Sequence, residues 1–269
     1  MSRVLVTGGT GALGRAVVEK LKGEGHTVRV MSRRPERPGS RRDVEWAEAN
    51  LATGMGIRAA VAGVDAIVHA ATDPFLHTRQ VDVEGTRRLL DEAGPAGVSH
   101  IVYPSIVGIE HLAQLAFPYY KAKVAVEQMV SNSGLPWSIL RATQFYSLVD
   151  RAIRVLSRSP VVLLDTEFRF QPIAESEVAG VLAACVTAGP GGRLPEVAGP
   201  QVLTAGELAR VWLAARGRHR LLVRVPLPGR VAAAFRRGAL TRPERTYGHI
   251  TWESWLSERY AREMPAAAH

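Results

Sequence analysis

Apolar residues in the first half of the chain form short continuous runs that alternate with segments of helical periodicity. The first run, Val4 to Val6, is followed by Leu13, Val17 and Leu21, which recur every four residues as on one face of a helix. Runs of this length are typical of strands buried on both faces of a parallel sheet. On this basis we expect strands over 4–6, 27–31, 44–49, 64–69, 100–103 and 136–140, and helices over 54–62, 81–93 and 120–132. Strands that alternate with helices predict an α/β fold, a doubly wound parallel sheet with right-handed crossovers.

The pattern becomes more mixed after about residue 145. Thr204 and Glu207 have the spacing of a capping box, which predicts the start of a helix at 204. We expect short strands over 161–164 and 168–173, and helices to about 158, over 175–188, 204–216 and 229–238, and from 251 onward. The chain is therefore expected to form a first domain over 1–145 and a smaller substrate-binding domain over 146–269, with some interleaving of segments. Four aromatic residues either line an apolar pocket in this second part or pack in its core: Phe145, Tyr146, Phe168 and Phe170.

Three glycines, Gly8, Gly11 and Gly14, separate the first predicted strand from the first predicted helix. This spacing suits a dinucleotide pyrophosphate, because it allows a tight turn, a close approach of the backbone and close packing of helix on strand. The unpaired N–H groups at the positive end of the helix then meet the phosphate oxygens. The contacts expected here are Gly8, Thr10, Gly11, Ala12, Leu13 and Gly14. The alternative is a glycine-rich turn that binds no ligand.

The end of the second predicted strand favours one form of the cofactor. In dinucleotide-binding folds a carboxylate at this point binds the ribose 2′-hydroxyl, whereas an arginine accommodates a 2′-phosphate. Here the residues are Ser32, Arg33 and Arg34. We therefore expect NADP(H), with Ser32 and Arg33 on the phosphate and Arg34 stacked on the adenine. The alternative is that both arginines are ordinary charges of the Arg-rich loop that continues over 35–43.

Two further strand ends are expected to line the cofactor. Asn50 and Leu51 follow the third predicted strand, where an adenine edge lies in such folds. Ala70, Ala71 and Thr72 follow the fourth, and their small size allows a cofactor to pass close to the backbone.

Composition limits the classes of function. The chain has 46% hydrophobic and 22% charged residues, as globular proteins do, and a net charge of +9. The positive charge comes from arginines scattered along the chain, because there are only four lysines. No basic stripe interleaves with aromatic residues, so we do not expect nucleic-acid binding.

Cysteine usage and hydropathy suggest a cellular location. Cys185 is the single cysteine, which excludes a disulfide within the chain, and no cysteine–histidine cluster suggests a metal site. No apolar run is long enough to span a bilayer, and the first strand begins at residue 3, with no room before it for a signal peptide. We expect a cytoplasmic protein without membrane contacts; its oligomeric state stays open.

Five motifs resemble those of the short-chain dehydrogenase/reductase superfamily, specifically its atypical branch of NmrA-like and quinone-reductase-like proteins. They are the segments 7–14, 64–71, 83–86 and 135–141, and Tyr119-x-x-x-Lys123 with Glu127 behind it. The resemblance covers residues 1–145 closely and the remainder more loosely. It implies a Rossmann-type fold and an NADP(H)-dependent oxidoreductase.

The resemblance also implies a catalytic group of Ser105, Tyr119 and Lys123. A carbonyl that receives hydride develops negative charge on its oxygen, so a proton donor is needed there, and a nearby cation makes a phenol a better donor. Lys123 lies one helical turn from Tyr119 and is expected to supply this field while binding the nicotinamide ribose. Ser105 is expected to hydrogen-bond the same substrate oxygen.

Three positions depart from the family's pattern: Ile106, which competes with Ser105 for the serine position, Asp82, where many relatives have asparagine, and Tyr120, which competes with Tyr119. The function expected first is NADPH-dependent reduction of a ketone or quinone group of a small apolar molecule. The intact Tyr119-x-x-x-Lys123 pair favours this enzyme, whereas Ile106 and Asp82 favour a regulator that senses NADP(H) without turnover. An epimerase would need a polar sugar-binding surface, which the apolar second half does not indicate.

Overall fold

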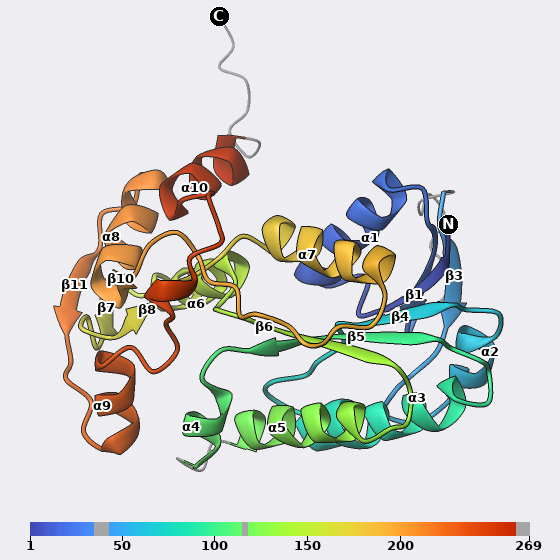
Figure 1. The fold of residues 1–269 in the computed structure, drawn as a ribbon. Coiled ribbons are helices and arrows are strands. Elements are labelled where there is room, and N and C mark those ends of the chain that lie inside the picture. Colours follow the sequence, from blue (N-terminus) through green and yellow to red (C-terminus); the bar gives the residue numbers. More distant parts are fainter. Residues whose placement is uncertain (35–42, 115–117, 262–269) are drawn as a thin grey trace, which may run out of the picture. The chain divides into compact units, whose positions relative to one another are not determined.

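The computed structural model describes residues 1–34, 43–114 and 118–261, and the chain divides into two compact units (Figure 1). Unit 1 comprises Met1–Arg141 and Ser176–Pro195, and unit 2 comprises Ala142–Glu175 and Glu196–His269. Segment 176–195 thus returns to the first unit after the chain has entered the second.

Unit 1 is built on a seven-stranded sheet in the order β3-β2-β1-β4-β5-β6-β9. Its strands are β1 (Arg3–Thr7), β2 (Thr27–Ser32), β3 (Glu45–Glu48), β4 (Ala66–His69), β5 (His100–Ile106), β6 (Trp137–Ala142) and β9 (Gly192–Arg193). The pairs of β1 with β2 and β4, of β2 with β3, of β4 with β5 and of β6 with β9 are all parallel. The expected α/β fold with a parallel sheet is confirmed, and its six expected strands are present. Strand β9 was not predicted, because Gly192 and Arg193 carry no apolar signal.

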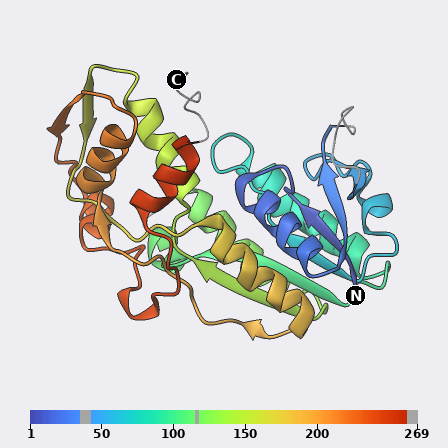
Figure 2. The same ribbon diagram turned by 90° about the horizontal axis from the view of Figure 1, so that it is seen from above.

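Helices cover both faces of this sheet. Figures 1 and 2 show α1 and α7 on one face, and Figure 1 shows α3 and α5 on the other. The helices of unit 1 are α1 (Ala12–Gly23), α2 (Ile57–Val61), the π-helix η1 (Arg79–Glu84), α3 (Gly85–Ala93), α4 (Ile109–Gln114), α5 (Pro118–Ser131) and α7 (Glu175–Ala188), whose first residue belongs to unit 2. The central strands β1, β4 and β5 are almost entirely buried, as their apolar runs predicted.

The sequence prediction missed α4. The segment between the expected strand over 100–103 and the expected helix over 120–132, for which no helix was predicted, contains α4, which begins after Gly108 at a φ of +73° and buries Ile109 and Leu112 one turn apart. The expected helix over 81–93 is helical throughout, with the π-helix η1 followed by α3. Of the expected loop over 35–43, residues 35–42 lie outside the described part of the chain.

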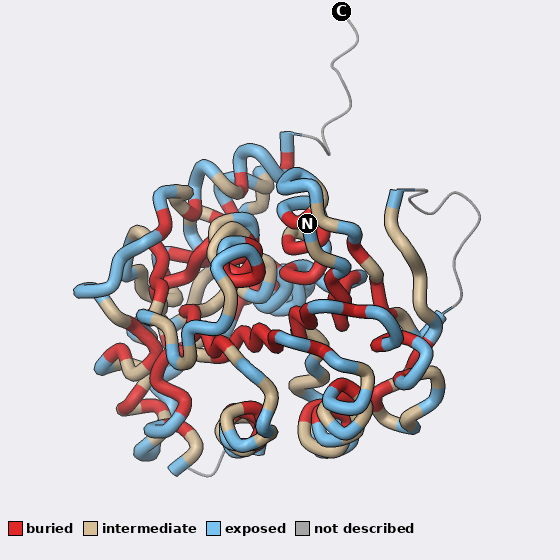
Figure 3. Tube along the Cα trace, turned by 45° about the vertical axis from the view of Figure 1, so that its right-hand side comes forward, coloured by how far each residue is buried: buried red, intermediate tan, exposed pale blue. Residues whose placement is uncertain are grey.

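Unit 2 packs around aromatic side chains. Its elements are α6 (Tyr146–Leu156), α8 (Ala205–Ala215), α9 (Arg230–Arg236), the 3₁₀ helix η2 (Pro243–Arg245) and α10 (Trp252–Ala261), with strands β7 (Val161–Leu164), β8 (Arg169–Phe170), β10 (Leu203–Thr204) and β11 (Leu221–Arg224). Tyr146, Trp212 and Trp252 are among its fully buried side chains. Figure 3 shows buried positions, in red, recurring along the trace. Of the four aromatic residues weighed above, Tyr146 and Phe170 belong to this core.

The predicted capping box of α8 is confirmed. Glu207 N donates to Thr204 Oγ1 at 3.2 Å, and Thr204 N donates to Glu207 Oε2 at 2.7 Å. In the described part of the chain, no helix has the length and apolar character needed to cross a membrane.

Candidate functional site

The glycine turn connects the end of β1 to the start of α1. Gly8 has a φ of +67°, and a Cβ atom there would lie 2.8 Å from the Cα of Ala71, so only glycine fits this close approach. Gly11 is the N-cap of α1 and provides no side-chain cap, and Thr10, Gly11 and Ala12 are exposed. The first N–H groups of α1 therefore have no side-chain partner at the cap, which fits a phosphate at this end of the helix.

The turn lies where the strand order of the sheet reverses. β1 is flanked by β2 on one side and β4 on the other, so the connections that leave β1 and β4 diverge. Ala71, just after β4, donates its N–H to Thr7 Oγ1 at 3.2 Å, which holds the two strand ends together. Ala70 and Ala71 thus lie beside the glycine turn, and the contacts of Ala70, Ala71 and Thr72 with a cofactor stay predictions.

Gly14 and Leu13 support the turn from behind. A Cβ atom at Gly14 would lie 2.1 Å from Gly8 O, so α1 packs directly on the backbone of the turn, and Leu13 is buried in the core. These two residues hold the N-terminal end of α1, the predicted phosphate site, in place.

The predicted ribose site comprises the last residue of β2 and the two residues after it. Arg33 and Arg34 are exposed, and Arg34 N donates to Ser32 Oγ at 3.2 Å. Asn50 Oδ1 accepts a hydrogen bond from Ala52 N at 3.0 Å, whereas the Leu51 side chain is buried in the core of unit 1. The contacts of all five residues with a cofactor stay predictions.

Lys123 is buried on α5 and lies against β5. Its Nζ donates to Pro104 O at 3.4 Å and lies 4.3 Å from the centroid of the Tyr103 ring. Burial lowers the pKa of Lys123 to about 8, while the charges of Asp82 and Glu127 act in the opposite direction. The ammonium group is therefore largely charged at neutral pH.

Tyr119 is one turn before Lys123 on the same helix. Burial raises the pKa of its phenol to about 12; a hydrogen bond with Thr72 lowers it, and Asp82 and Tyr120 raise it. The structure therefore shows a raised pKa where the sequence argument invoked a cation that lowers it. The phenol is protonated at neutral pH and is able to donate a proton.

Ser105 is buried near the end of β5, and among the described residues its Oγ atom has no hydrogen-bond partner. Burial raises the pKa of Glu127, but hydrogen bonds from Arg141 and Arg193 outweigh it, so the net pKa is lowered. The contact of Ser105 with a substrate oxygen stays a prediction.

A buried chain of side chains joins the glycine turn to Lys123. Thr7 Oγ1 lies 2.7 Å from His69 Nδ1, and the His69 ring stacks on Tyr103 with centroids 5.7 Å apart. His69 Nε2 lies 2.8 Å from Thr86 Oγ1. Burial lowers the pKa of His69 to about 3, so this histidine is neutral at physiological pH. Tyr103 was not identified from the sequence, because an aromatic residue in an apolar strand is normally core.

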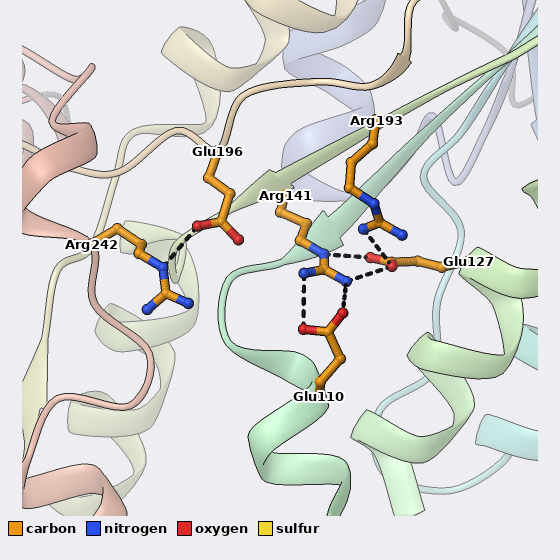
Figure 4. Close-up of polar contacts among 6 residues, drawn as sticks. All are labelled: Glu110, Glu127, Arg141, Arg193, Glu196 and Arg242. Atoms are coloured by element: carbon orange, nitrogen blue, oxygen red, sulfur yellow. Dashed lines mark hydrogen bonds and ion pairs between the residues drawn. The ribbon is translucent and has the colours of Figure 1, made fainter.

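An ion cluster supports α5 from the side of β6 (Figure 4). Arg141 Nε donates to Glu127 Oε1 at 2.9 Å, and its Nη1 donates to Glu110 Oε2 at 3.0 Å. Arg193 Nη1 donates to Glu127 Oε2 at 2.9 Å. Glu127, one turn after Lys123, is thereby held by two arginines. Among the described residues no group of three or more metal-binding side chains occurs.

Comparisons with known proteins identify the family of the chain. A profile described as NAD(P)H-binding matches residues 8–188. The chain is 33% identical over 207 residues to the (4-alkanoyl-5-oxo-2,5-dihydrofuran-3-yl)methyl phosphate reductase of Streptomyces griseus subsp. griseus, covering 76% of this chain and 70% of that protein. It is 30% identical over 150 residues to the photosystem II assembly factor Ycf39 of Synechocystis sp., covering 53% of this chain and 45% of that protein.

Two solved structures share the fold. The NADPH-dependent quinone oxidoreductase QOR2 of Escherichia coli has a TM-score of 0.77 at 17% identity and covers 96% of this chain and 99% of that one. Triphenylmethane reductase from Citrobacter sp. has a TM-score of 0.77 at 18% identity, covering 97% and 99%. The chain therefore belongs to the NAD(P)H-binding family, in the atypical branch of the short-chain dehydrogenases/reductases.

Proposed function

We propose that this NAD(P)H-dependent reductase uses NADPH to reduce a ketone or quinone group of a small molecule, with Tyr119 as the proton donor. The observation that carries the proposal is the continuous contact from the glycine turn through His69 and Tyr103 to Lys123. It supports the proposal because Thr7, His69 and Tyr103 belong to the three neighbouring strands β1, β4 and β5 and connect the residues beside the predicted phosphate site with the predicted catalytic helix. Ligands of open α/β sheets bind at the carboxyl edge of the strands.

One relative supports a reductase function for this chain. The Streptomyces protein is named as a reductase and is similar over most of both chains. Its named substrate also carries a phosphate group, so an anionic substrate belongs among the candidates for this chain, beside the apolar ones expected from the sequence.

The side chains of unit 1 have separable roles in this reaction. Lys123, charged below about pH 8, would bind the nicotinamide ribose, and Tyr119, protonated up to about pH 12, would give its proton to the developing alkoxide. The bound cofactor supplies the hydride. The product alcohol thus gains one hydride and one proton, and solvent returns the proton to the phenol. We propose that unit 2, the predicted substrate domain, selects the substrate.

A screen for NADPH oxidation tests the function. We expect consumption of NADPH with at least one member of a set of apolar ketones, quinones and phosphate-bearing ketones. Tight binding of NADPH with no turnover of any of these compounds would instead favour the NADP(H)-sensing regulator.

The cofactor preference is predicted from the ribose site. NADPH should bind at least tenfold more tightly than NADH, about 1.4 kcal/mol, because Arg33 can pair with a 2′-phosphate and no carboxylate stands beside it. Titration calorimetry of Arg33→Asp should show this preference erased or reversed. Arg87→Asp is the matched control, an exposed arginine on α3 with the same change of charge. Equal affinities of the parent for both cofactors would contradict the assignment.

A second prediction concerns Gly11. Valine at this position should abolish NADPH binding while the protein keeps its fold, because a Cβ there meets only Gly8 O, at 3.2 Å, and the added side chain would occupy space at the predicted phosphate site. Gly23→Val, at the other end of α1 with open space around it, should bind NADPH normally. If Gly11→Val bound NADPH normally in a fluorescence titration, the glycine segment would be a turn that does not bind phosphate.

A further inference from the structure

The ring of Tyr103 is a close neighbour of the buried Lys123 ammonium group. Lys123 Nζ lies over this ring, 4.3 Å from its centroid, and both side chains are almost fully buried. Its hydrogen bond to Pro104 O, at 3.4 Å, is longer than is usual for such bonds. An ammonium group that has lost its water needs other partners, and the face of an aromatic ring attracts a cation most strongly where water is excluded. The Tyr103 ring therefore compensates for part of the hydration that Lys123 has lost.

The hydroxyl group of Tyr103 does not explain why a tyrosine stands at this position. Among the described residues, its oxygen is buried and has no hydrogen-bond partner. A buried tyrosine hydroxyl group normally has a partner, because an unpaired buried polar group is unfavourable. The ring is thus the part of this side chain that makes the contacts, and a phenylalanine ring would make the same ones.

His69 holds the Tyr103 ring in one orientation. The two rings are stacked, with centroids 5.7 Å apart and an angle of 28° between their planes. The single hydrogen of the Thr86 hydroxyl group goes to Asp82 O, so Thr86 Oγ1 accepts from His69 Nε2 at 2.8 Å. His69 Nδ1 then accepts from Thr7 Oγ1 at 2.7 Å. His69 is therefore a neutral imidazole in one tautomer, and it is fixed at both nitrogens.

We propose that Tyr103 is a positioning residue for Lys123: its ring, stacked on His69, holds the ammonium group in place and stabilises its positive charge. The proposal rests on the proposed function in one respect, the binding of the nicotinamide ribose by Lys123. Tyr103 acts on the reaction through Lys123 alone, and no bond of Tyr103 is made or broken.

Charged groups on several elements also act on Lys123. Burial lowers the pKa of Lys123 to about 8, against the charges of Asp82 on η1 and Glu127 on α5, which raise it. Further titratable groups around α5 are either neutral at neutral pH or held in ion pairs: His69, Tyr119, Tyr120, Glu110 with Arg141, and Arg88 with Glu84. Exchange of the Tyr103 ring for an aliphatic side chain changes none of these charges. A change in the titration of Lys123 therefore reports the ring.

Lysine-selective ¹³C labelling makes Lys123 visible in the protein without any ligand. The chain has four lysines, and Lys123 alone among them is buried, so NMR of the labelled side chains gives four signals of which one is distinct. The signal that disappears in Lys123→Arg is that of Lys123. In the parent, its Cε protons should be shifted upfield from those of the other three lysines by the ring current of Tyr103. If they show no such shift, the ammonium group does not lie over the ring and the proposal is wrong.

Two substitutions at Tyr103 test the stabilisation of the charge. Tyr103→Leu should lower the pKa of Lys123 by about one unit, because the charged form loses the ring face while the side chain stays buried. Tyr103→Phe keeps the ring and removes only the unpartnered hydroxyl group, so Lys123 should titrate as in the parent. An unchanged pKa of Lys123 in Tyr103→Leu, or an equal decrease in Tyr103→Phe, would overturn the proposal.

NADPH affinity at two pH values connects this contact with the proposed function. Tyr103→Leu should bind NADPH like the parent at about pH 6 but about fivefold more weakly at about pH 8, because a pKa one unit lower leaves about a tenth rather than about half of Lys123 charged. Tyr103→Phe should bind NADPH like the parent at both pH values. A loss of affinity in Tyr103→Leu that is equal at both pH values would show that the ring only supports the fold, and would overturn the positioning role.

The two measurements separate this proposal from the proposed function. If Tyr103→Leu lowers the pKa of Lys123 but binds NADPH like the parent at both pH values, the ring stabilises Lys123 and Lys123 does not bind the ribose. If NADPH oxidation requires Lys123 but Tyr103→Leu leaves the pKa of Lys123 unchanged, the reductase stands and the role of Tyr103 is refuted.

Discussion

Replacement of Tyr119 by phenylalanine is expected to slow NADPH oxidation by about two to four orders of magnitude, the range found when a general acid is removed. The phenyl ring keeps the packing against Tyr120, whose ring centroid lies 5.5 Å away, so the change removes the proton and little else. NADPH affinity should be unchanged. Single-turnover oxidation of NADPH with an accepted ketone or quinone measures the effect without interference from product release.

Two variants make this result specific. Tyr120→Phe, the neighbouring tyrosine on the same helix, should keep nearly full activity. Lys123→Ala should lose NADPH affinity and turnover together, because it removes both the ribose contact and a buried positive charge. In the parent, activity should fall as the pH rises through about 8, where Lys123 loses its proton. Unchanged rates in Tyr119→Phe would refute the acid role and transfer it to Ser105 or water.

Replacement of Arg141 by methionine is expected to lower the free energy of unfolding by about 3 kcal/mol, because removal of one partner leaves buried charge uncompensated. Arg141 pairs with the buried Glu127 through two hydrogen bonds and with Glu110 through two more. The effect falls at the lower end of the range for buried pairs, because Arg193 still contacts Glu127. Denaturant unfolding followed by circular dichroism measures it.

The control is Arg58→Met, which breaks an exposed pair with Glu92 and should cost at most about 1 kcal/mol. The pKa values of Glu110 and Glu127 are both lowered in the folded protein, chiefly through hydrogen bonds from Arg141 that overcome burial at Glu127. Their stabilising contribution is therefore present at neutral pH and is lost as the pH falls through these lowered values. The difference in the free energy of unfolding between the parent and Arg141→Met should accordingly become smaller at acidic pH. If Arg58→Met and Arg141→Met lowered the free energy of unfolding equally, the ion cluster around Arg141 would not stabilise the fold.

The local pattern of residues was sufficient to predict the main strands of unit 1 and its glycine turn. Continuous apolar runs predicted six strands of the parallel sheet, and four-residue periodicity predicted α1, because both signals arise from neighbouring residues on one element. The spacing of Gly8, Gly11 and Gly14 indicated the tight turn between β1 and α1, and Thr204 with Glu207 indicated the start of α8. Each of these features is complete within a few turns of the chain.

Tertiary structure alone decided the polar contacts of the site. Arg141 meets Glu110 across 31 residues, and Thr7 meets His69 across 62. The pattern of neighbouring residues does not predict such pairs, because they depend on which strand ends lie side by side in the sheet. Burial is the largest cause of the raised pKa of Tyr119. Because burial depends on tertiary packing, the Tyr-x-x-x-Lys spacing alone did not predict it. The sequence by itself predicted the main strands and helices of unit 1 and named the candidate site residues; packing decided which of those residues touch.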